Sequence, residues 1–135
     1  MDPVKPKKSL GQHFLADRNI AAKIVGSLTY KGYNAVVEIG PGMGVLSSFL
    51  LEKKDTDIRF IEIDASAVEF LKNKFPGIEK SIINADILST GLQDIFKVPF
   101  AVIGNLPYNI SSQIFFKILE NKNMVNEVVC MVQRE

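Results

Sequence analysis

The sequence has very little cysteine and histidine. Its 135 residues include one cysteine, Cys130, and one histidine, His13. A single cysteine excludes an internal disulfide, and with a single histidine it also excludes an ordinary zinc site. Cys130 lies in the apolar run at residues 128–132, so we expect a small buried hydrophobic residue rather than a reactive thiol.

Long apolar runs and an excess of one charge are also missing. No apolar run reaches the length of a membrane-spanning helix, and the polar N-terminus is unlike a secretory signal peptide. The 16 basic and 15 acidic residues nearly cancel, so the net charge favours neither nucleic acid nor membrane as a partner. We therefore expect a cytoplasmic protein with no membrane partner and no metal.

Basic residues are nevertheless concentrated at the N-terminus. Lys5, Lys7 and Lys8 crowd the first eight positions, and residues 1–9 also contain two prolines. We expect residues 1–9 to form a basic, extended arm, which is either simply solvated or contacts RNA phosphates. With 47% hydrophobic residues, residues 10–135 are enough for one domain with its own core.

Apolar runs alternate with amphipathic segments over residues 10–135. Asp17 is a good N-cap for a first helix with Ile20, Ile24, Val25 and Leu28 on one face. The run at residues 35–39 is bounded by loops that contain glycine and is typical of a central parallel strand. We expect later strands at residues 58–63, 81–84, 100–103 and 127–132, a helix with Leu46, Phe49 and Leu50 on one face, a helix at residues 65–75, and a helix with Ile114, Phe115, Ile118 and Leu119. This alternation predicts an α/β fold with a Rossmann-like, doubly wound, mostly parallel sheet and its first strand at the centre.

A glycine-rich turn, Gly40-Pro41-Gly42-Met43-Gly44, joins the first strand to the next helix. Glycines permit a tight turn in which backbone N–H groups approach a ligand closely. The spacing is GxGxG, whereas the dinucleotide fingerprint GxGxxG requires a glycine at position 45, which is valine here. The turn therefore predicts a ligand site, but not an ordinary dinucleotide site.

Acidic residues lie in or just after the predicted strands. Glu38 interrupts an apolar strand, and a buried carboxylate there suits a cationic or amine-bearing ligand. Glu62 ends the second strand, where an acid can accept both hydroxyls of a ribose. Asp64 competes for that role, although it also suits the N-cap of the next helix.

The third predicted strand ends at Asp86, which can accept from an adenine amino group while Ile63 and Ile87 enclose the ring. A pocket for an amine, a ribose and an adenine fits S-adenosylmethionine better than NAD, because the pyrophosphate of NAD has no use for Glu38. We therefore expect a methyl-donor site.

The motif Asn105-Leu106-Pro107-Tyr108 follows a buried strand and Gly104, so it should sit just past the carboxyl end of that strand. Open α/β sheets bind their ligands at this edge. The motif offers an amide, a backbone carbonyl that the following proline keeps out of the sheet, and an aromatic ring. Together these groups can bind a planar, nitrogen-bearing group by its edge and its face.

Several motifs resemble the ribosomal RNA adenine N6-dimethyltransferases, a family that includes bacterial and organellar small-subunit dimethylases and erythromycin-resistance methylases. They are GQHFL at 11–15, EIGPGMG at 38–44, IEID at 61–64, NADIL at 84–88 and GNLPYNIS at 104–111, in the family's order. The resemblance implies dimethylation of adenine N6 in small-subunit ribosomal RNA, with S-adenosylmethionine as the donor and the pre-ribosomal small subunit as the partner.

The resemblance also implies individual roles. Glu38 and the glycine loop would bind the methionine part of the donor with Gln12 nearby, Glu62 would bind its ribose, and Asp86 its adenine amino group. Asn105 and the Leu106 carbonyl would accept from the target amine, and Tyr108 would stack on its ring. His13 stands where many bacterial relatives carry asparagine, and we assign it local hydrogen bonds rather than catalysis. The donor site is assigned to Gln12, His13, Leu15, Glu38, Gly40, Gly42, Gly44, Glu62, Ile63, Asp86, Ile87 and Asn105, catalysis to Asn105, Leu106, Pro107 and Tyr108, and RNA binding to Lys5, Lys7, Lys8 and Tyr108.

Members of this family continue past the fifth strand, whereas this sequence stops at Glu135. We therefore expect a partial methyltransferase domain at residues 10–135, truncated after the fifth strand and able to self-associate through an exposed apolar edge at residues 128–132. A non-catalytic RNA-binding ribosome-assembly factor is one alternative, which the intact donor and amine-binding residues disfavour. Methyl transfer to a DNA adenine or a protein glutamine is another, which Leu106 and the GQHF element disfavour.

Overall fold

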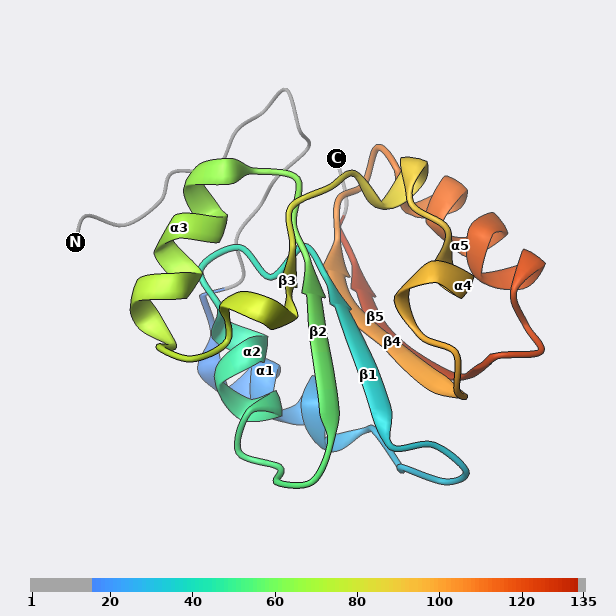
Figure 1. Cartoon of the computed structure of the whole chain (residues 1–135), viewed down its shortest axis with the longest axis horizontal. Helices are drawn as coiled ribbons and strands as arrows, with labels where there is room; N and C mark the ends of the chain where they lie inside the picture. Colours follow the sequence, from blue (N-terminus) through green and yellow to red (C-terminus); the bar gives the residue numbers. More distant parts are fainter. Residues whose placement is uncertain (1–15, 134–135) are drawn as a thin grey trace.

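A computed structural model describes residues 16–133. One sheet of five strands has the order β3-β2-β1-β4-β5, and every strand pairing in it is parallel (Figure 1). The strands are β1 (Ala35–Ile39), β2 (Asp57–Ile61), β3 (Ile82–Ile83), β4 (Phe100–Leu106) and β5 (Val125–Val132), and the helices are α1 (Arg18–Gly26), α2 (Val45–Leu50), α3 (Ala65–Lys74), α4 (Leu92–Ile95) and α5 (Ser111–Glu120). This confirms the predicted doubly wound sheet with β1 at its centre.

Strand β1 is buried along its whole length because it pairs with β2 on one side and β4 on the other. Its side chains alternate between the two faces of the sheet. Val37 belongs to the core that α4 and α5 cover, whereas Val36 packs in the core under α1 and α2. The same alternation places Glu38 on the face of α1 and α2, and this placement decides what it can contact.

The end of β4 differs from the sequence-based expectation. Asn105 and Leu106 were expected just past the strand, but they pair with Met131 and Val132 of β5 and belong to β4. The extension depends on a partner strand that is distant in the sequence. Pro107 ends the strand because it has no N–H to donate. Conversely, β2 ends at Ile61, earlier than expected, although the Glu62 N–H still donates to the Ile83 carbonyl at 2.9 Å.

Some apolar side chains on the predicted helices are exposed. Ile20 on α1 is 41% exposed and Leu119 on α5 is 61% exposed. On α5 the buried apolar pair is Ile114 and Ile118, and Leu119 follows about 100° further round the helix. The 3-10 turn Ile87–Ser89 and α4, which lie between β3 and β4, were not expected.

Strand β5 lies at the edge of the sheet, as predicted (Figure 1). Val128 and Val132 are 38% and 46% exposed, while self-association through this edge stays a prediction. Cys130 is half-buried against the core, and burial raises the pKa of its thiol. That environment agrees with the expected hydrophobic role of this cysteine.

Within residues 16–133, no helix has the length and apolar character that crossing a membrane requires. No group of His, Cys, Asp and Glu side chains in that part of the chain is arranged to hold a metal ion. The predictions for the basic arm at residues 1–9, with Lys5, Lys7 and Lys8, and for Gln12, His13 and Leu15 lie outside the described residues.

Candidate functional site

A pocket opens at the carboxyl ends of β1, β2, β3 and β4, the edge where the sequence placed the ligand site. It brings together most of the predicted site residues in the described part of the chain, although they are far apart in the sequence. The predicted residues that line it are Glu38, Gly40, Gly42, Glu62, Ile63, Asp86, Ile87, Asn105 and Pro107. Gly44, Leu106 and Tyr108 are not among its lining residues.

The glycine loop adopts the backbone conformation that glycine favours. Gly40, Gly42 and Gly44 have φ of 65°, 58° and 82°. A Cβ on Gly40 would meet no atom within 4 Å, so its surroundings are open. A Cβ on Gly44 would lie 2.7 Å from Phe75 Cε2, so this glycine allows the loop to pack against the end of α3. The loop therefore combines an open ligand-facing part with a packing position.

Glu62 is tied to two backbone groups and is 3% exposed. Its Oε1 accepts from the Gly42 N–H at 2.9 Å, and its Oε2 accepts from the Asp64 N–H at 3.0 Å. Burial is the main cause that raises the pKa of Glu62, and these hydrogen bonds act against it. Each carboxylate oxygen can accept a second hydrogen bond, so Glu62 can still take two ligand hydroxyls.

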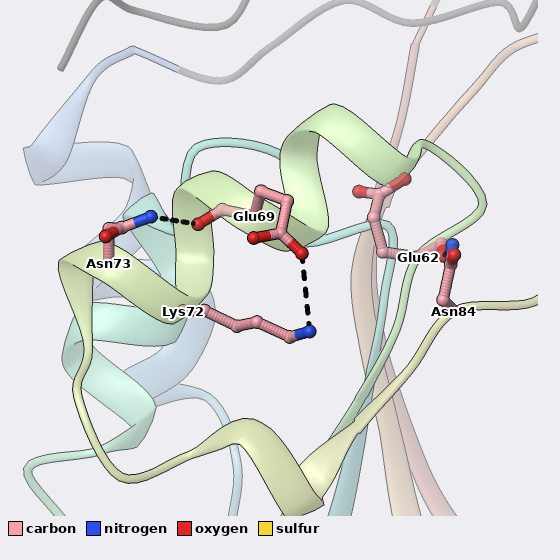
Figure 2. Close-up of polar contacts among 5 residues, drawn as sticks. All are labelled: Glu62, Glu69, Lys72, Asn73 and Asn84. Atoms are coloured by element: carbon pink, nitrogen blue, oxygen red, sulfur yellow. Dashed lines mark hydrogen bonds and ion pairs between the residues drawn. The ribbon is translucent and has the colours of Figure 1, made fainter.

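In the segment after β2, Glu62 and Asp64, the two acids considered for the ribose, have different roles. Asp64 caps α3, since its Oδ1 accepts from the Ser66 N–H at 2.9 Å and from the Ser66 hydroxyl at 2.7 Å. Asn84 holds the chain beside it, because its amide donates to the Glu62 carbonyl at 2.8 Å. Figure 2 shows Glu62 and Asn84 beside the start of α3, away from the Glu69–Lys72 contact along that helix. Glu62, and not Asp64, lines the pocket.

Glu38 lies under the glycine loop and is 1% exposed. The Ser47 hydroxyl on α2 donates to its Oε1 at 2.5 Å. Burial raises the pKa of Glu38 to about 8, with the Ser47 hydrogen bond lowering it and the Glu62 charge raising it. Ser47 was not predicted as a site residue, and its one signal in the sequence is a polar residue on a helix that buries Leu46 and Leu50.

The predicted adenine end of the pocket lies at the 3-10 turn Ile87–Ser89. Asp86 caps this turn by accepting from the Leu88 N–H at 2.9 Å through Oδ1. Ile87 is buried, whereas Ile63 is 45% exposed at the pocket wall. An exposed isoleucine beside a half-buried acid is suited to a flat apolar ring with a polar edge.

The Asn105–Tyr108 motif departs from the expectation in one respect. The Leu106 carbonyl accepts from the Gln133 N–H at 3.3 Å, so Pro107 does not keep this carbonyl out of the sheet. Because a carbonyl oxygen has two lone pairs, it can still accept from a ligand. Asn105 is half-buried and Tyr108 is 37% exposed. Asn109 and Gln133 also line the pocket, and the sequence analysis assigned neither to the site.

The charge of the pocket has one sign. In the described part of the chain its lining includes Glu38, Glu62 and Asp86, and neither Lys nor Arg. Apolar residues from the strand ends, from the loops that follow them and from α2 make up most of the rest. Such a pocket favours a ligand with a positive charge, hydroxyls and an apolar ring.

The chain matches the family model described as ribosomal RNA adenine dimethylase over residues 4–135. It is 47% identical over 136 aligned residues to the ribosomal RNA small subunit methyltransferase A of Cytophaga hutchinsonii, covering all of this chain and 53% of that protein. The chain thus spans about half the length of this curated relative.

Two solved structures of methyltransferases also superpose on this chain. The crystal structure of the 23S rRNA methyltransferase ErmE superposes with a TM-score of 0.65 at 33% identity, over 80% of this chain and 43% of that one. A dimethyladenosine transferase from Plasmodium falciparum superposes with a TM-score of 0.70 at 26% identity, over 90% of this chain and 44% of that one.

Proposed function

Since the chain belongs to the ribosomal RNA adenine dimethylase family, we propose that it transfers methyl groups from S-adenosylmethionine to the N6 amino group of adenines in small-subunit ribosomal RNA. The observation that carries the proposal is one pocket that brings together Glu38, Glu62 and Asn105 from neighbouring strand ends. The target RNA is proposed from the name of the Cytophaga relative, and action on ribosomal subunits implies the cytoplasm.

The residues present fit this donor. The buried Glu38 carboxyl suits the positively charged methionine end, and Glu62 has spare acceptor positions for the ribose hydroxyls. Asp86, Ile63 and Ile87 would hold the adenine. When bound, S-adenosylmethionine supplies an activated methyl group. Outside the described residues, we propose that Gln12, His13 and Leu15 contribute to the donor site.

The role of the Asn105–Tyr108 motif is to hold the target amine. An exocyclic adenine nitrogen is a poor nucleophile because its lone pair is delocalised into the ring. The Asn105 amide oxygen and the Leu106 carbonyl can each accept one of its N–H groups, which directs the lone pair toward the donor. This is catalysis by positioning and electrostatic preorganisation, and it requires no general base with a tuned pKa.

Binding of the RNA would use groups at the mouth of the pocket. Tyr108 is partly exposed beside Pro107, and its ring can replace the stacking that a base loses when it leaves its helix or loop. We propose that Lys5, Lys7 and Lys8 contact RNA phosphates.

The test is methyl transfer from labelled S-adenosylmethionine to small ribosomal subunits that lack the modification. The 135-residue chain and the longer Cytophaga relative are compared in one assay. We expect label in adenine N6 of the RNA with both proteins. Donor binding without transfer by either would favour an assembly factor, and label only in DNA adenine or protein glutamine would assign a different amine.

A further inference from the structure

The Glu38 carboxyl and the Ser47 hydroxyl form a closed pair beneath the glycine loop. Glu38 is 1% exposed and Ser47 is fully buried, and the hydroxyl donates to Oε1 at 2.5 Å. Ser47 lies on α2 directly after the glycine loop, and Glu38 is near the end of β1. One hydroxyl therefore fixes a buried acid at the wall of the proposed donor pocket.

The surroundings of this pair disfavour a charge. The charged group whose field acts on Glu38 is Glu62, which faces the same pocket from the segment after β2. Within residues 16–133, no Lys, Arg or His forms an ion pair with Glu38, and its side-chain partner on α2 is neutral. A second carboxylate in a closed space is costly unless a cation arrives.

We propose that donor binding expels one proton from the Glu38 carboxyl to solvent, and that Ser47 is the positioning residue that fixes the resulting carboxylate toward the positive methionine end of the donor. The inference rests on the proposed function, because it requires a cationic donor in this pocket. Protonated Glu38 and the free cation become a buried ion pair plus one hydrated proton, so charge and atoms balance. Burial, which raises the pKa of Glu38 to about 8, agrees with a carboxyl that is neutral before the donor binds.

The proton can be counted by calorimetry. S-adenosylmethionine is titrated into the 135-residue chain in two buffers with different ionisation enthalpies, at pH 6.5 and at pH 8.5. With the pKa of Glu38 raised to about 8, we expect roughly one proton released per donor at pH 6.5 and fewer at pH 8.5. The donor amine also titrates near this range, so the same count for Glu38→Gln is subtracted. A subtracted count near zero at both pH values overturns the proposal.

Ser47 is tested by the pH profile. Loss of its hydrogen bond raises the pKa of Glu38 further, so Ser47→Ala should release more protons than the wild type at pH 8.5. Its donor affinity at pH 7 should fall about tenfold, the usual effect of one hydrogen bond to a charged group. Ser47→Thr keeps the hydroxyl and should restore both values.

A purely structural role for Ser47 would weaken donor binding in the alanine variant without moving the pH profile, and that result would overturn its assignment. The results for the wild type also distinguish failure of this inference from failure of the proposed function. Donor binding without proton release would contradict this inference alone. Absence of donor binding would contradict both the proposed function and this inference.

Discussion

The Gly42 N–H donates a hydrogen bond to Glu62 Oε1 at 2.9 Å, and this contact joins the glycine loop to the segment after β2. Two parts of the proposed donor site are therefore held at a fixed spacing before any ligand arrives. The second oxygen is fixed by the Asp64 N–H at 3.0 Å. Both hydrogen-bond donors, the N–H groups of Gly42 and Asp64, belong to the backbone. Each of them therefore needs an acceptor atom at the position of a Glu62 carboxylate oxygen.

Glu62→Gln places an amide NH2 against one of these two N–H groups. We expect the free energy of unfolding to fall by about 1–3 kcal/mol, because one buried backbone donor loses its partner. Donor affinity should fall at least about tenfold, since one acceptor for the ribose is lost with it. Urea denaturation and calorimetry with S-adenosylmethionine measure the two effects.

Glu69→Gln is the matched control for Glu62. Glu69 lies on α3, away from Glu62, and pairs with Lys72 at 3.4 Å on the exposed face of the helix (Figure 2). Exposed pairs of this kind contribute about 0–1 kcal/mol, so the control should keep stability and donor affinity close to wild type. Equal losses in the two variants would remove Glu62 from the donor site.

The free energy of unfolding should depend on pH through the titration of Glu38. Because burial raises its pKa from 4.5 to about 8 in the folded protein, its contribution to stability is fully present below pH 4.5 and is lost as the pH rises through 8. Glu38→Gln stays neutral, so above pH 8 it should be more stable than the wild type by an amount on the order of a few kcal/mol.

Urea denaturation of both proteins at pH 5 and pH 9 tests this difference. The effect of groups that do not interact with Glu38 is common to the two chains and largely cancels when the chains are compared. Parallel loss of stability in the wild type and in Glu38→Gln would show that Glu38 is not held neutral.

The sequence predicted those parts of the site that depend on strand ends. Glu62 and Asp86 follow parallel strands, and the carboxyl ends of such strands meet at one edge, so their convergence needed no distant contact. Ser47 could not be assigned to the site, because the role of a serine on a helix depends on the residue that it contacts in the fold, here Glu38. The Leu106 carbonyl was misplaced since its partner, Gln133, is supplied by a strand pairing that local sequence does not encode.

A third prediction concerns the opposite end of the sheet. The Tyr33 hydroxyl donates to Glu127 Oε1 at 2.5 Å and accepts from the Tyr30 N–H at 3.0 Å, which ties the loop before β1 to the edge strand β5. Tyr33→Phe removes both contacts and should lower the free energy of unfolding by about 1–3 kcal/mol at pH 7. Differential scanning calorimetry would detect the change as a lower Tm.

Tyr30→Phe is the control for Tyr33, because it preserves the ring contacts to Tyr33 at 5.4 Å and to Lys53 at 4.4 Å. Burial would raise the pKa of Glu127, but hydrogen bonds from Tyr33 and Thr29 outweigh it and lower the pKa. The stability they add is thus present above the ordinary glutamate pKa and is lost at lower pH. The difference in the free energy of unfolding between the wild type and Tyr33→Phe should therefore become smaller at acidic pH. A difference that does not change with pH would argue against the Tyr33–Glu127 hydrogen bond.

The exposed edge at β5 gives a prediction about assembly. Val128 and Val132 are partly exposed on the edge strand, and an apolar edge can pair with a second copy. We expect concentration-dependent association by sedimentation velocity, and its loss in the double variant Val128→Lys, Val132→Lys. A monomer at millimolar concentration before substitution would contradict the expectation.

The last prediction separates donor binding from methyl transfer at Asn105. The side chain is half-buried at the end of β4 and lines the pocket, where its amide oxygen would accept from the target amine. Asn105→Ala should lower methyl transfer to small ribosomal subunits by about 10²–10³-fold, as for other preorganised acceptors and donors, with donor affinity nearly unchanged. Asn73→Ala removes an exposed amide that donates along α3 to the Glu69 carbonyl, and should change neither. Loss of donor binding in Asn105→Ala would contradict the amine-positioning role, because that role leaves the donor's own contacts intact.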